Sequence, residues 1–292
     1  MIHDRSWGSR LFDIINSTIL ILFALSTLLP FIHIVSSSFA SPTEKLTKDF
    51  VLFPTHFTLD AYRFIFSTDR ILNSLLVTVL ITVGGTIVNL VMTCLMAYPL
   101  SRRDLIGRRP IMMMVIFTLL FSGGMIPTFL IVKALGLLDS MWALIIPSAI
   151  STFNLIILKN FFQQMPDGIE ESAKIDGAND LSILIRIILP LSLPALATFG
   201  LFYAVGHWNT FMSAILYIRD TDKWPIQVLL RSFVLLSEGR IDDAANLDGD
   251  IQLPPETVKM AVITVATLPI LCVYPFLQKH FAKGVMMGSI KG

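Results

Sequence analysis

The chain has 292 residues, of which 54% are hydrophobic and 15% are charged, and its mean hydropathy is +0.73. This composition is too apolar for a soluble globular protein of that length, and it indicates a membrane protein. The formal net charge of +1 argues against a nucleic-acid partner and against strong attraction to anionic surfaces.

Apolar runs long enough to cross a bilayer recur along the chain. A helix rises 1.5 Å per residue, so about 20 apolar residues cross roughly 30 Å of hydrocarbon. The third of these runs contains Gly123, Gly124 and Pro127, which predict a kink. The sequence predicts an all-α membrane protein whose single domain, residues 1–292, has six transmembrane helices. They lie at about residues 14–34, 72–100, 111–132, 141–161, 194–217 and 258–277.

The first run has a competing interpretation as a cleaved signal peptide. Ser38-Phe39-Ala40 beyond it has the form of a signal-peptidase site. The run is longer than the usual 7–15-residue apolar region of a signal peptide, which favours an uncleaved span.

The polar segment 166–193, between the fourth and fifth runs, begins with the pattern of a short helix. Asp167 is a predicted N-cap, and Glu170 completes a capping box three residues later. Lys174 is placed to pair with Glu170 at i,i+4.

A turn and a second helix follow in the same segment. Gly177 can take the left-handed conformation that ends a helix. Asn179 or Asp180 is then expected to cap a helix rich in Ile and Leu, which should stop before Pro190. The prediction is a short helix, a tight turn and an apolar helix at a membrane surface.

The segment also carries a motif at fixed spacing. Glu171-Ser172-Ala173 is followed after three residues by Gly177, and after nine more by Ile187-x-Leu189-Pro190. This motif resembles the EAA loop of ABC-importer permeases, with Ser172 in place of the usual first alanine. The flanking Ile175-Asp176-Gly177-Ala178 and Leu189-Pro190-Leu191 look like the carbohydrate-uptake branch of that family. The plain alternative is an ordinary interfacial helical hairpin.

The resemblance implies a complete architecture. The fold would be that of a type I ABC importer permease, with six spans and a cytoplasmic coupling helix. The partners would be a second permease subunit, two ATPase subunits and an extracytoplasmic solute-binding protein. ATP and Mg would be bound by the ATPase, so this chain would hold no cofactor. The residues expected to serve coupling are Glu170, Glu171, Ser172, Ala173, Asp176, Gly177, Ala178, Leu189 and Pro190.

The fifth run contains a polar stretch from Gly206 to Thr210. His207 and Asn209 either bond to neighbouring helices or line the translocation path, with Trp208 as a stacking surface for a sugar ring. Asn89 and Asn154 share this ambiguity.

The distribution of basic residues predicts the topology. Six spans put both termini on one side, where the short segments carry clusters of basic residues. The positive-inside rule makes that side cytoplasmic. The resemblance to ABC-importer permeases implies a multi-pass protein of the bacterial inner membrane. The acidic outer segment 218–256 is then either a solvated loop or a docking surface for the binding protein. The basic residues are Arg5, Arg10, Arg102, Arg103, Arg108, Arg109, Lys279, Lys283 and Lys291.

The tail 278–292 also resembles the family. It looks like the C-terminus of the second permease subunit in maltose-type importers, which reaches into the ATPase dimer. The resemblance implies ATPase contacts for Lys291 and Gly292. The alternative is a basic terminus held at anionic lipid headgroups.

The sequence contains no motif for chemistry of its own. It lacks a P-loop, an H-E-x-x-H helix, a G-x-S-x-G elbow and a cysteine–histidine cluster at metal spacing. We therefore expect neither an enzyme nor a metal site.

An ion-coupled secondary carrier or channel subunit is the alternative function. Carriers place ionisable groups at bilayer depth, and His207 is the one titratable residue in the middle of a run. No inverted repeat is evident, so energy is expected to enter from a partner.

The substrate is indicated by resemblance alone. The carbohydrate branch implies an oligosaccharide or polysaccharide, and related systems import acidic sugars such as alginate or pectic fragments. The runs offer no Arg or Lys away from their ends that would specifically hold a uronate. Selection is therefore expected to lie with the binding protein.

Overall fold

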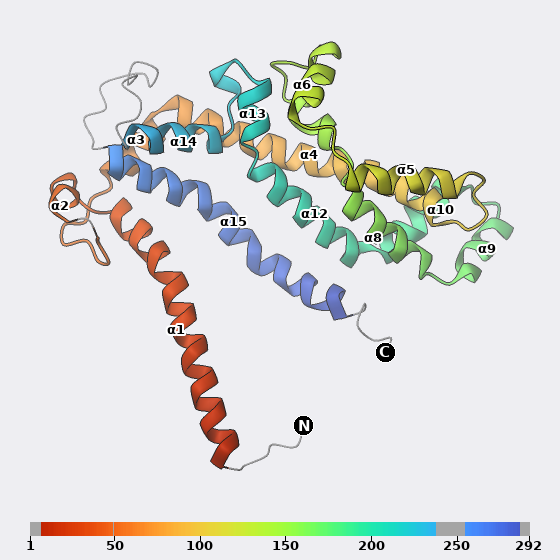
Figure 1. Cartoon of the computed structure of the whole chain (residues 1–292), viewed down its shortest axis with the longest axis horizontal. Coiled ribbons are helices and arrows are strands. Elements are labelled where there is room, and N and C mark those ends of the chain that lie inside the picture. Colours follow the sequence, from red (N-terminus) through yellow and green to blue (C-terminus); the bar gives the residue numbers. More distant parts are fainter. Residues whose placement is uncertain (1–6, 49, 238–254, 287–292) are drawn as a thin grey trace. The chain divides into compact units, whose positions relative to one another are not determined.

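The computed structural model describes residues 7–48, 50–237 and 255–286 (Figure 1). Within these ranges every named element is a helix, and the one extended pairing is an isolated antiparallel bridge between Ala40 and Phe57. The prediction of an all-α protein is confirmed. The chain divides into two compact units, which are described separately: residues 1–69 with 230–267, and residues 70–229 with 268–292.

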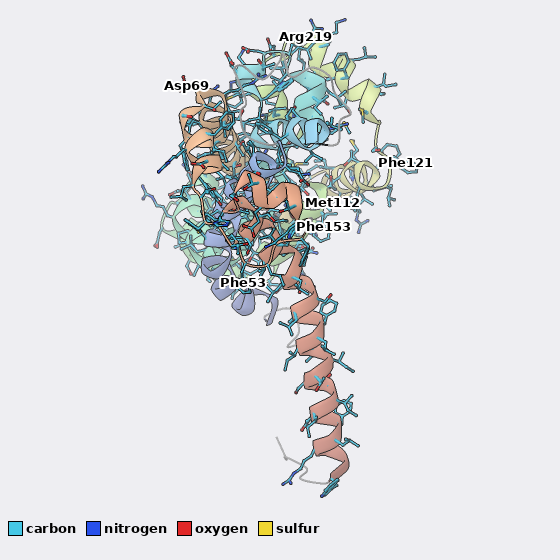
Figure 2. All side chains as sticks on the ribbon, turned by 90° about the vertical axis from the view of Figure 1, so that its left-hand side faces the viewer. Phe53, Asp69, Met112, Phe121, Phe153 and Arg219 are labelled. Carbon is cyan, nitrogen blue, oxygen red and sulfur yellow. The ribbon has the colours of Figure 1, made fainter. Side chains whose placement is uncertain are left out.

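The first unit holds α1 (Trp7–Ser38), α2 (Pro42–Thr47) and α3 (Asp60–Ser67). The apolar side chains of α1 project on all sides of the helix (Figure 2), and its most apolar 18-residue window is wholly exposed. A helix that is apolar all round is stable only in hydrocarbon or against other apolar elements. The physical character of α1 therefore fits the predicted first span.

The second unit begins along α4 (Asp69–Ser101), which starts at the unit boundary. At 1.5 Å per residue this helix is about 50 Å long, more than the hydrocarbon thickness, so a spanning α4 would be tilted. The helices between α4 and residue 166 are α5 (Arg108–Leu120), α6 (Met125–Ala134), α7 (Trp142–Ile145), the 3₁₀ turn Ile146–Ser148 and α8 (Thr152–Gln163).

The later helices complete the described chain. They are α9 (Asp167–Ile175), α10 (Asp180–Ile183), a π-helical turn (Leu184–Ile188), α11 (Leu189–Leu191), α12 (Leu193–Trp208), α13 (Met212–Tyr217), the 3₁₀ turn Thr221–Lys223, α14 (Ile226–Ser237) and α15 (Pro255–Met286). The last two cross from one unit to the other.

Among the described residues, three helices are long and apolar enough to span a membrane singly, namely α1, α4 and α15. Three bent pairs bring the number to as many as six: α5 with α6, α7 with α8, and the helix from Asp180 to Leu191 with α12. The upper figure equals the six predicted spans, and half of these are broken. The fifth differs in its bounds, because the third bent pair begins at Asp180 and α12 ends at Trp208, before the predicted end at residue 217.

The third predicted span is a broken helix rather than a kinked one. Its two halves, α5 and α6, are bent by 118°. The chain turns through Gly124, whose φ of +84° is open to glycine and strained for other residues. The sequence predicted a kink, and the actual change of direction is larger.

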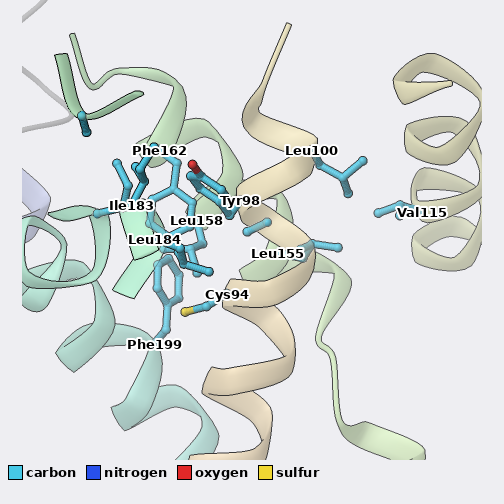
Figure 3. Packing of buried hydrophobic residues seen from close by; sticks show 13 residues of the cluster. Cys94, Tyr98, Leu100, Val115, Leu155, Leu158, Phe162, Ile183, Leu184 and Phe199 are labelled. Carbon is cyan, nitrogen blue, oxygen red and sulfur yellow. The ribbon is translucent and has the colours of Figure 1, made fainter. Parts of the chain in front are cut away.

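A cluster of buried side chains holds the segment 166–193 against α4 (Figure 3). Tyr98 and Cys94 of α4 face Phe162 of α8, Leu184 of the π turn and Phe199 of α12. Side chains from α4, α5, α8, α9, α10 with the π turn, and α12 thus share one apolar core. The cluster consists of Cys94, Ala97, Tyr98, Leu100, Val115, Leu155, Leu158, Phe162, Ala173, Ile183, Leu184, Ile188 and Phe199.

Candidate functional site

The candidate site is the segment 166–193, called here the coupling loop. Its first helix, α9, begins after Pro166, which occupies the N-cap position without a side-chain cap hydrogen bond. The predicted capping box of Asp167 and Glu170 is therefore wrong, because Asp167 is already the first helical residue. The predicted pair of Glu170 with Lys174 is wrong too, since Lys174 Nζ lies 3.6 Å from Asp180 Oδ1.

The inner face of α9 carries Glu170 and Ala173, three residues apart and each only 8% exposed. The Glu170 carboxylate accepts a hydrogen bond from the Tyr98 hydroxyl and forms an ion pair with Arg102. The Arg102 guanidinium carbon also lies 4.5 Å from the centre of the Tyr98 ring. Ala173 packs into the cluster of Figure 3. These contacts fix the inner face within this chain.

The outer face of α9 is open. Glu171, Ser172 and Asp176 are exposed, and the Ile175 side chain is 86% exposed. The Ser172 hydroxyl donates to the Gly168 carbonyl at 2.7 Å, inside its own helix. A carboxylate beside an exposed isoleucine is a surface of the kind that a protein partner covers.

The turn after α9 is confirmed as predicted. Gly177 has φ +80°. Its N–H donates to the Lys174 carbonyl at 3.0 Å, and the Ala178 N–H donates to the Ala173 carbonyl at 2.9 Å. This pair of bonds is a Schellman motif, which satisfies carbonyls that the helix end leaves free. The geometry requires a residue that tolerates positive φ.

The second helix of the loop begins as predicted and ends later than predicted. Asn179 caps it by accepting the Ser182 N–H at 2.8 Å. The helix does not stop before Pro190, because a π turn precedes the proline and the Leu189 N–H donates to the Leu184 carbonyl. The wider turn lets the helix pass through Pro190 and end at Leu191. Leu189 is partly buried against the cluster, and Pro190 is exposed.

The end of α4 is held by neighbouring helices as well. Gln163 Nε2 donates to the Ser101 carbonyl at 3.0 Å, and Arg108 Nε donates to the Leu100 carbonyl at 2.9 Å. Carbonyls at a helix end need such partners. The coupling loop therefore stands on a well-anchored helix terminus.

Residues 89–287 match the family model described as the binding-protein-dependent transport system inner membrane component. The chain belongs to this family. It is thus an inner-membrane permease of an ABC transporter, and the alternative of an ion-coupled carrier or channel is wrong.

Similar proteins span almost the whole permease. The polygalacturonan/rhamnogalacturonan transport system permease protein YtcP of Bacillus subtilis (strain 168) is 62% identical over 284 residues, which are 97% of this chain and 99% of that protein. Protein LplC of the same organism is 54% identical over 294 residues, 99% of this chain and 98% of that one.

A solved structure has the same fold. It is the crystal structure of a bacterial ABC transporter involved in the import of the acidic polysaccharide alginate. One of its chains is 35% identical to this permease with a TM-score of 0.87, and the match covers 94% of this chain and 98% of that chain. The predicted type I permease fold is confirmed.

Asn89 has a structural partner in the broken fourth span. Its Nδ2 donates to the Ser148 carbonyl at 3.0 Å. Nearby, the Tyr203 hydroxyl accepts the Ser151 N–H at 3.1 Å and bonds to Thr93 Oγ1 at 2.7 Å. These side chains satisfy backbone groups that the break before α8 exposes. Sequence reasoning missed Tyr203, although a tyrosine within an apolar span was a usable signal.

The other predicted path residues lie in α8, in α12 or just after it. His207 is 5% exposed and its ring lies against Gly85, where an added Cβ would come within 2.5 Å of Nε2. Trp208 and Asn154 are buried as well. Asn209 is the exposed member of the set, and its Nδ2 donates to the Val205 carbonyl at 2.9 Å. Of the five residues, Asn209 is therefore the most accessible to a solute.

Two acidic residues that sequence reasoning missed organise the other polar segments. Glu44 is 5% exposed and accepts the backbone N–H groups of Thr55 and His56, the Thr55 hydroxyl and Lys48 Nζ. Bonds from the Thr55 side chain and backbone hold the pKa of the Glu44 carboxyl at about 2. A usable local signal was the capping-box pattern Ser41-Pro42-Thr43-Glu44, whose Ser41 hydroxyl oxygen accepts the Glu44 N–H at 3.3 Å.

Asp139 is the second of these residues. It has φ +62° and accepts the N–H groups of Asp220 and Arg219 at 3.0 and 3.1 Å. The Asp220 N–H is the largest cause that lowers the pKa of Asp139 below its usual value. Asp139 thereby ties the turn after α6 to the start of the acidic segment. Trp224, in the same acidic segment, donates its indole N–H to the Ile218 carbonyl at 3.2 Å.

The C-terminal prediction is only partly covered. α15 continues to Met286, so the beginning of the tail 278–292 is helical. Lys291 and Gly292 lie outside the described residues. Within the described ranges, no group of three or more His, Cys, Asp or Glu side chains could hold a metal ion.

Proposed function

We propose that this permease pairs with a second permease subunit and couples transport to ATP hydrolysis on two separate ATPase subunits. The observation that carries the proposal is the two-sided nature of α9. Its inner face is fixed by Glu170 and Ala173, and its outer face presents Glu171 and Ile175 to a partner. A helix whose inner face is fixed and whose outer face is exposed can pass a displacement from the ATPase to the rest of the permease.

The mechanism follows from that arrangement. α9 docks in a groove of the ATPase with Glu171 in polar contact, and ATP binding closes the ATPase dimer. The two coupling loops are drawn together, and the bundle rocks from inward-open to outward-open. Gly177 and its Schellman turn keep α9 at a fixed angle to the second helix, which leads into α12. ATP hydrolysis then resets the cycle.

In this proposal the coupling loop and both termini lie in the cytoplasm. The positive-inside rule supports this orientation through the arginines at positions 102, 103, 108 and 109. The outer segments then face an extracytoplasmic binding protein. In the same assembly, Lys291 and Gly292 of the tail contact the ATPase dimer.

The cargo is a carbohydrate, and we propose an acidic oligosaccharide such as a pectic or alginate fragment. The names of the similar proteins support this class. The binding protein selects the sugar, and the membrane path is lined in part by Asn209, with His207, Trp208, Asn154 and Asn89 behind it.

Reversal of one charge tests the docking role. Glu171→Lys should lower ATPase association by roughly tenfold, because it removes an attractive contact and adds a repulsive one. The measurement is co-purification of the ATPase with the permease at low and high salt. The defect should shrink at high salt, where exposed charges are screened.

The matched control is Asp104→Lys, which reverses an exposed carboxylate in the neighbouring polar turn. It should leave association near the wild-type level. Equal association of wild type and Glu171→Lys at both salt concentrations would contradict the docking role. The cargo is tested by asking whether pectic, alginate or neutral oligosaccharides raise the melting temperature of the binding protein.

A further inference from the structure

The inner face of α9 makes a connection that helix formation alone does not require. We propose that Glu170, Tyr98 and Arg102 form a latch that makes the coupling helix and the end of α4 move as one body. Glu170 is the positioning residue of this latch. The inference rests on the proposed coupling role of α9 and adds the route by which its displacement enters the membrane.

The geometry of the latch restricts rotation as well as separation. The carboxylate of Glu170 is held by two groups at once, a hydroxyl from Tyr98 and a guanidinium from Arg102. The guanidinium lies 4.5 Å from the centre of the Tyr98 ring, which orients its planar fork. Three planar groups that contact one another leave α9 little freedom to roll on α4.

Burial makes the latch hard to open. The side chains of Arg102 and Glu170 are 19% and 10% exposed. A charge withdrawn from water is stable only while it is paired, so removal of one partner leaves the other uncompensated. If the Glu170 side chain turned outward to an ATPase, the Arg102 guanidinium would lose the carboxylate that pairs with it.

The surroundings extend the connection into the membrane. Gln163 of α8 and the side chain of Arg108 bind the last carbonyls of the same helix, α4. Farther along α4, Gly85 contacts His207 of α12. A displacement of α9 is thus carried by a continuous 33-residue helix to its contacts with the broken fourth and fifth spans.

The first experiment uses the complete importer in proteoliposomes, with its ATPase subunits and binding protein. Glu170→Gln and Arg102→Gln should each lower the number of sugars transported per ATP hydrolysed by about fivefold or more, the lower end of a typical coupling energy. ATPase co-purification should remain at the wild-type level. The matched control is Arg103→Gln, an exposed neighbour of Arg102, which should keep the wild-type ratio.

A covalent replacement of the latch gives the second readout. Cysteines at positions 102 and 170 are introduced together with Cys272→Ser, because Cys272 is exposed while Cys94 is buried. Without reagent the pair should be poorly coupled, and a short bifunctional thiol reagent should restore coupling. If the glutamine variants fail to assemble, this comparison within one protein decides the question.

Two results would overturn the latch. One is a wild-type transport ratio in both glutamine variants, and the other is a cross-linked pair that transports no better than, or worse than, the uncrosslinked one. Failure of the docking role has a different signature, because Glu171→Lys would then retain both its ATPase and its transport.

Discussion

Two buried glutamates, one in each unit, perform different mechanical tasks. Glu44 accepts N–H groups from Thr55 and His56, so it closes a loop upon itself. Glu170 is held by side chains of Tyr98 and Arg102, so it joins one helix to another. The comparison teaches that a buried glutamate can close a loop or join two helices, depending on where its partners come from, and only the second arrangement fits the proposed transmission of movement.

The partners also decide how each contact responds to change. The contacts of Glu44 with backbone N–H groups, called here the Glu44 clasp, can be lost without disturbing distant helices. A latch of side chains between helices is part of the route along which force travels. Variants of the coupling loop should therefore impair coupling, while variants of the Glu44 clasp should have local effects.

The largest effect is expected for Gly177→Pro. Proline fixes φ near −65°, whereas Gly177 has φ +80°, and proline removes the N–H that donates to the Lys174 carbonyl. The complex should assemble and its uptake should fall to background, as measured in proteoliposomes. Gly177→Asn is the control, because asparagine tolerates the left-handed region and should keep most of the uptake. Normal uptake by Gly177→Pro would exclude a coupling role for this turn.

Glu44→Ala should give a large local effect. Loss of the carboxylate leaves the N–H groups of Thr55 and His56 without their acceptor, so hydrogen exchange there should speed up strongly. The number of sugars per ATP should stay near the wild-type value, unlike that of Glu170→Gln. Asp60→Ala, which removes an exposed carboxylate paired with Arg63 in the same unit, is the control. Unchanged exchange in Glu44→Ala would show that the clasp is unimportant in solution.

Replacing His207 and Asn209 together by alanine should weaken transport without loss of expression. Asn209→Ala alone should lower uptake by about threefold, as expected for one hydrogen bond to the solute. His207 packs on Gly85, so its substitution also disturbs helix packing. A decrease that arises from His207→Ala alone, with Asn209→Ala normal, would argue against a path role for Asn209.

The smallest expected effect is a loss of hydrogen-exchange protection around Glu44 when the pH is lowered. The folded-state pKa of Glu44, about 2, lies below its usual value of 4.5. The stabilisation is therefore complete above pH 4.5 and declines as the pH falls towards 2. Hydrogen exchange of residues 50–57 should be protected at pH 5 and lose protection below pH 4. In Glu44→Gln this pH dependence should disappear, and its persistence would assign it to another group.

The sequence predicted the local features of the coupling loop best. The left-handed turn at Gly177 and the cap at Asn179 depend on neighbours within a few residues, so local rules were sufficient. The predicted capping box is absent, and the Glu170 carboxylate instead accepts a hydrogen bond from Tyr98, 72 residues away. No local pattern reveals such a partner. The predicted helix end before Pro190 was wrong for a related reason. A π turn just before the proline lets the helix continue through it.

The number of spans was predictable and their continuity was not. Hydropathy measures the length of an apolar run, and the six runs have helical counterparts among the described residues. The 118° bend between α5 and α6 depends on a positive φ at Gly124 and on packing that hydropathy does not contain. The motif likewise located the coupling segment without revealing that its inner face is bound to α4.

The contact between α9 and the ATPase is tested most directly by cross-linking from Ile175, whose side chain is 86% exposed. Ile175→Cys in a Cys272→Ser background is treated with a bifunctional thiol reagent in the assembled importer. An impermeant maleimide is also added outside intact cells, with Phe53→Cys as the positive control, because Phe53 is 83% exposed and lies between the first two predicted spans, on the side proposed to face outward. We predict a cross-link from position 175 to the ATPase and no labelling from outside. Labelling of position 175 from outside, or no ATPase cross-link in the complete complex, would contradict the account.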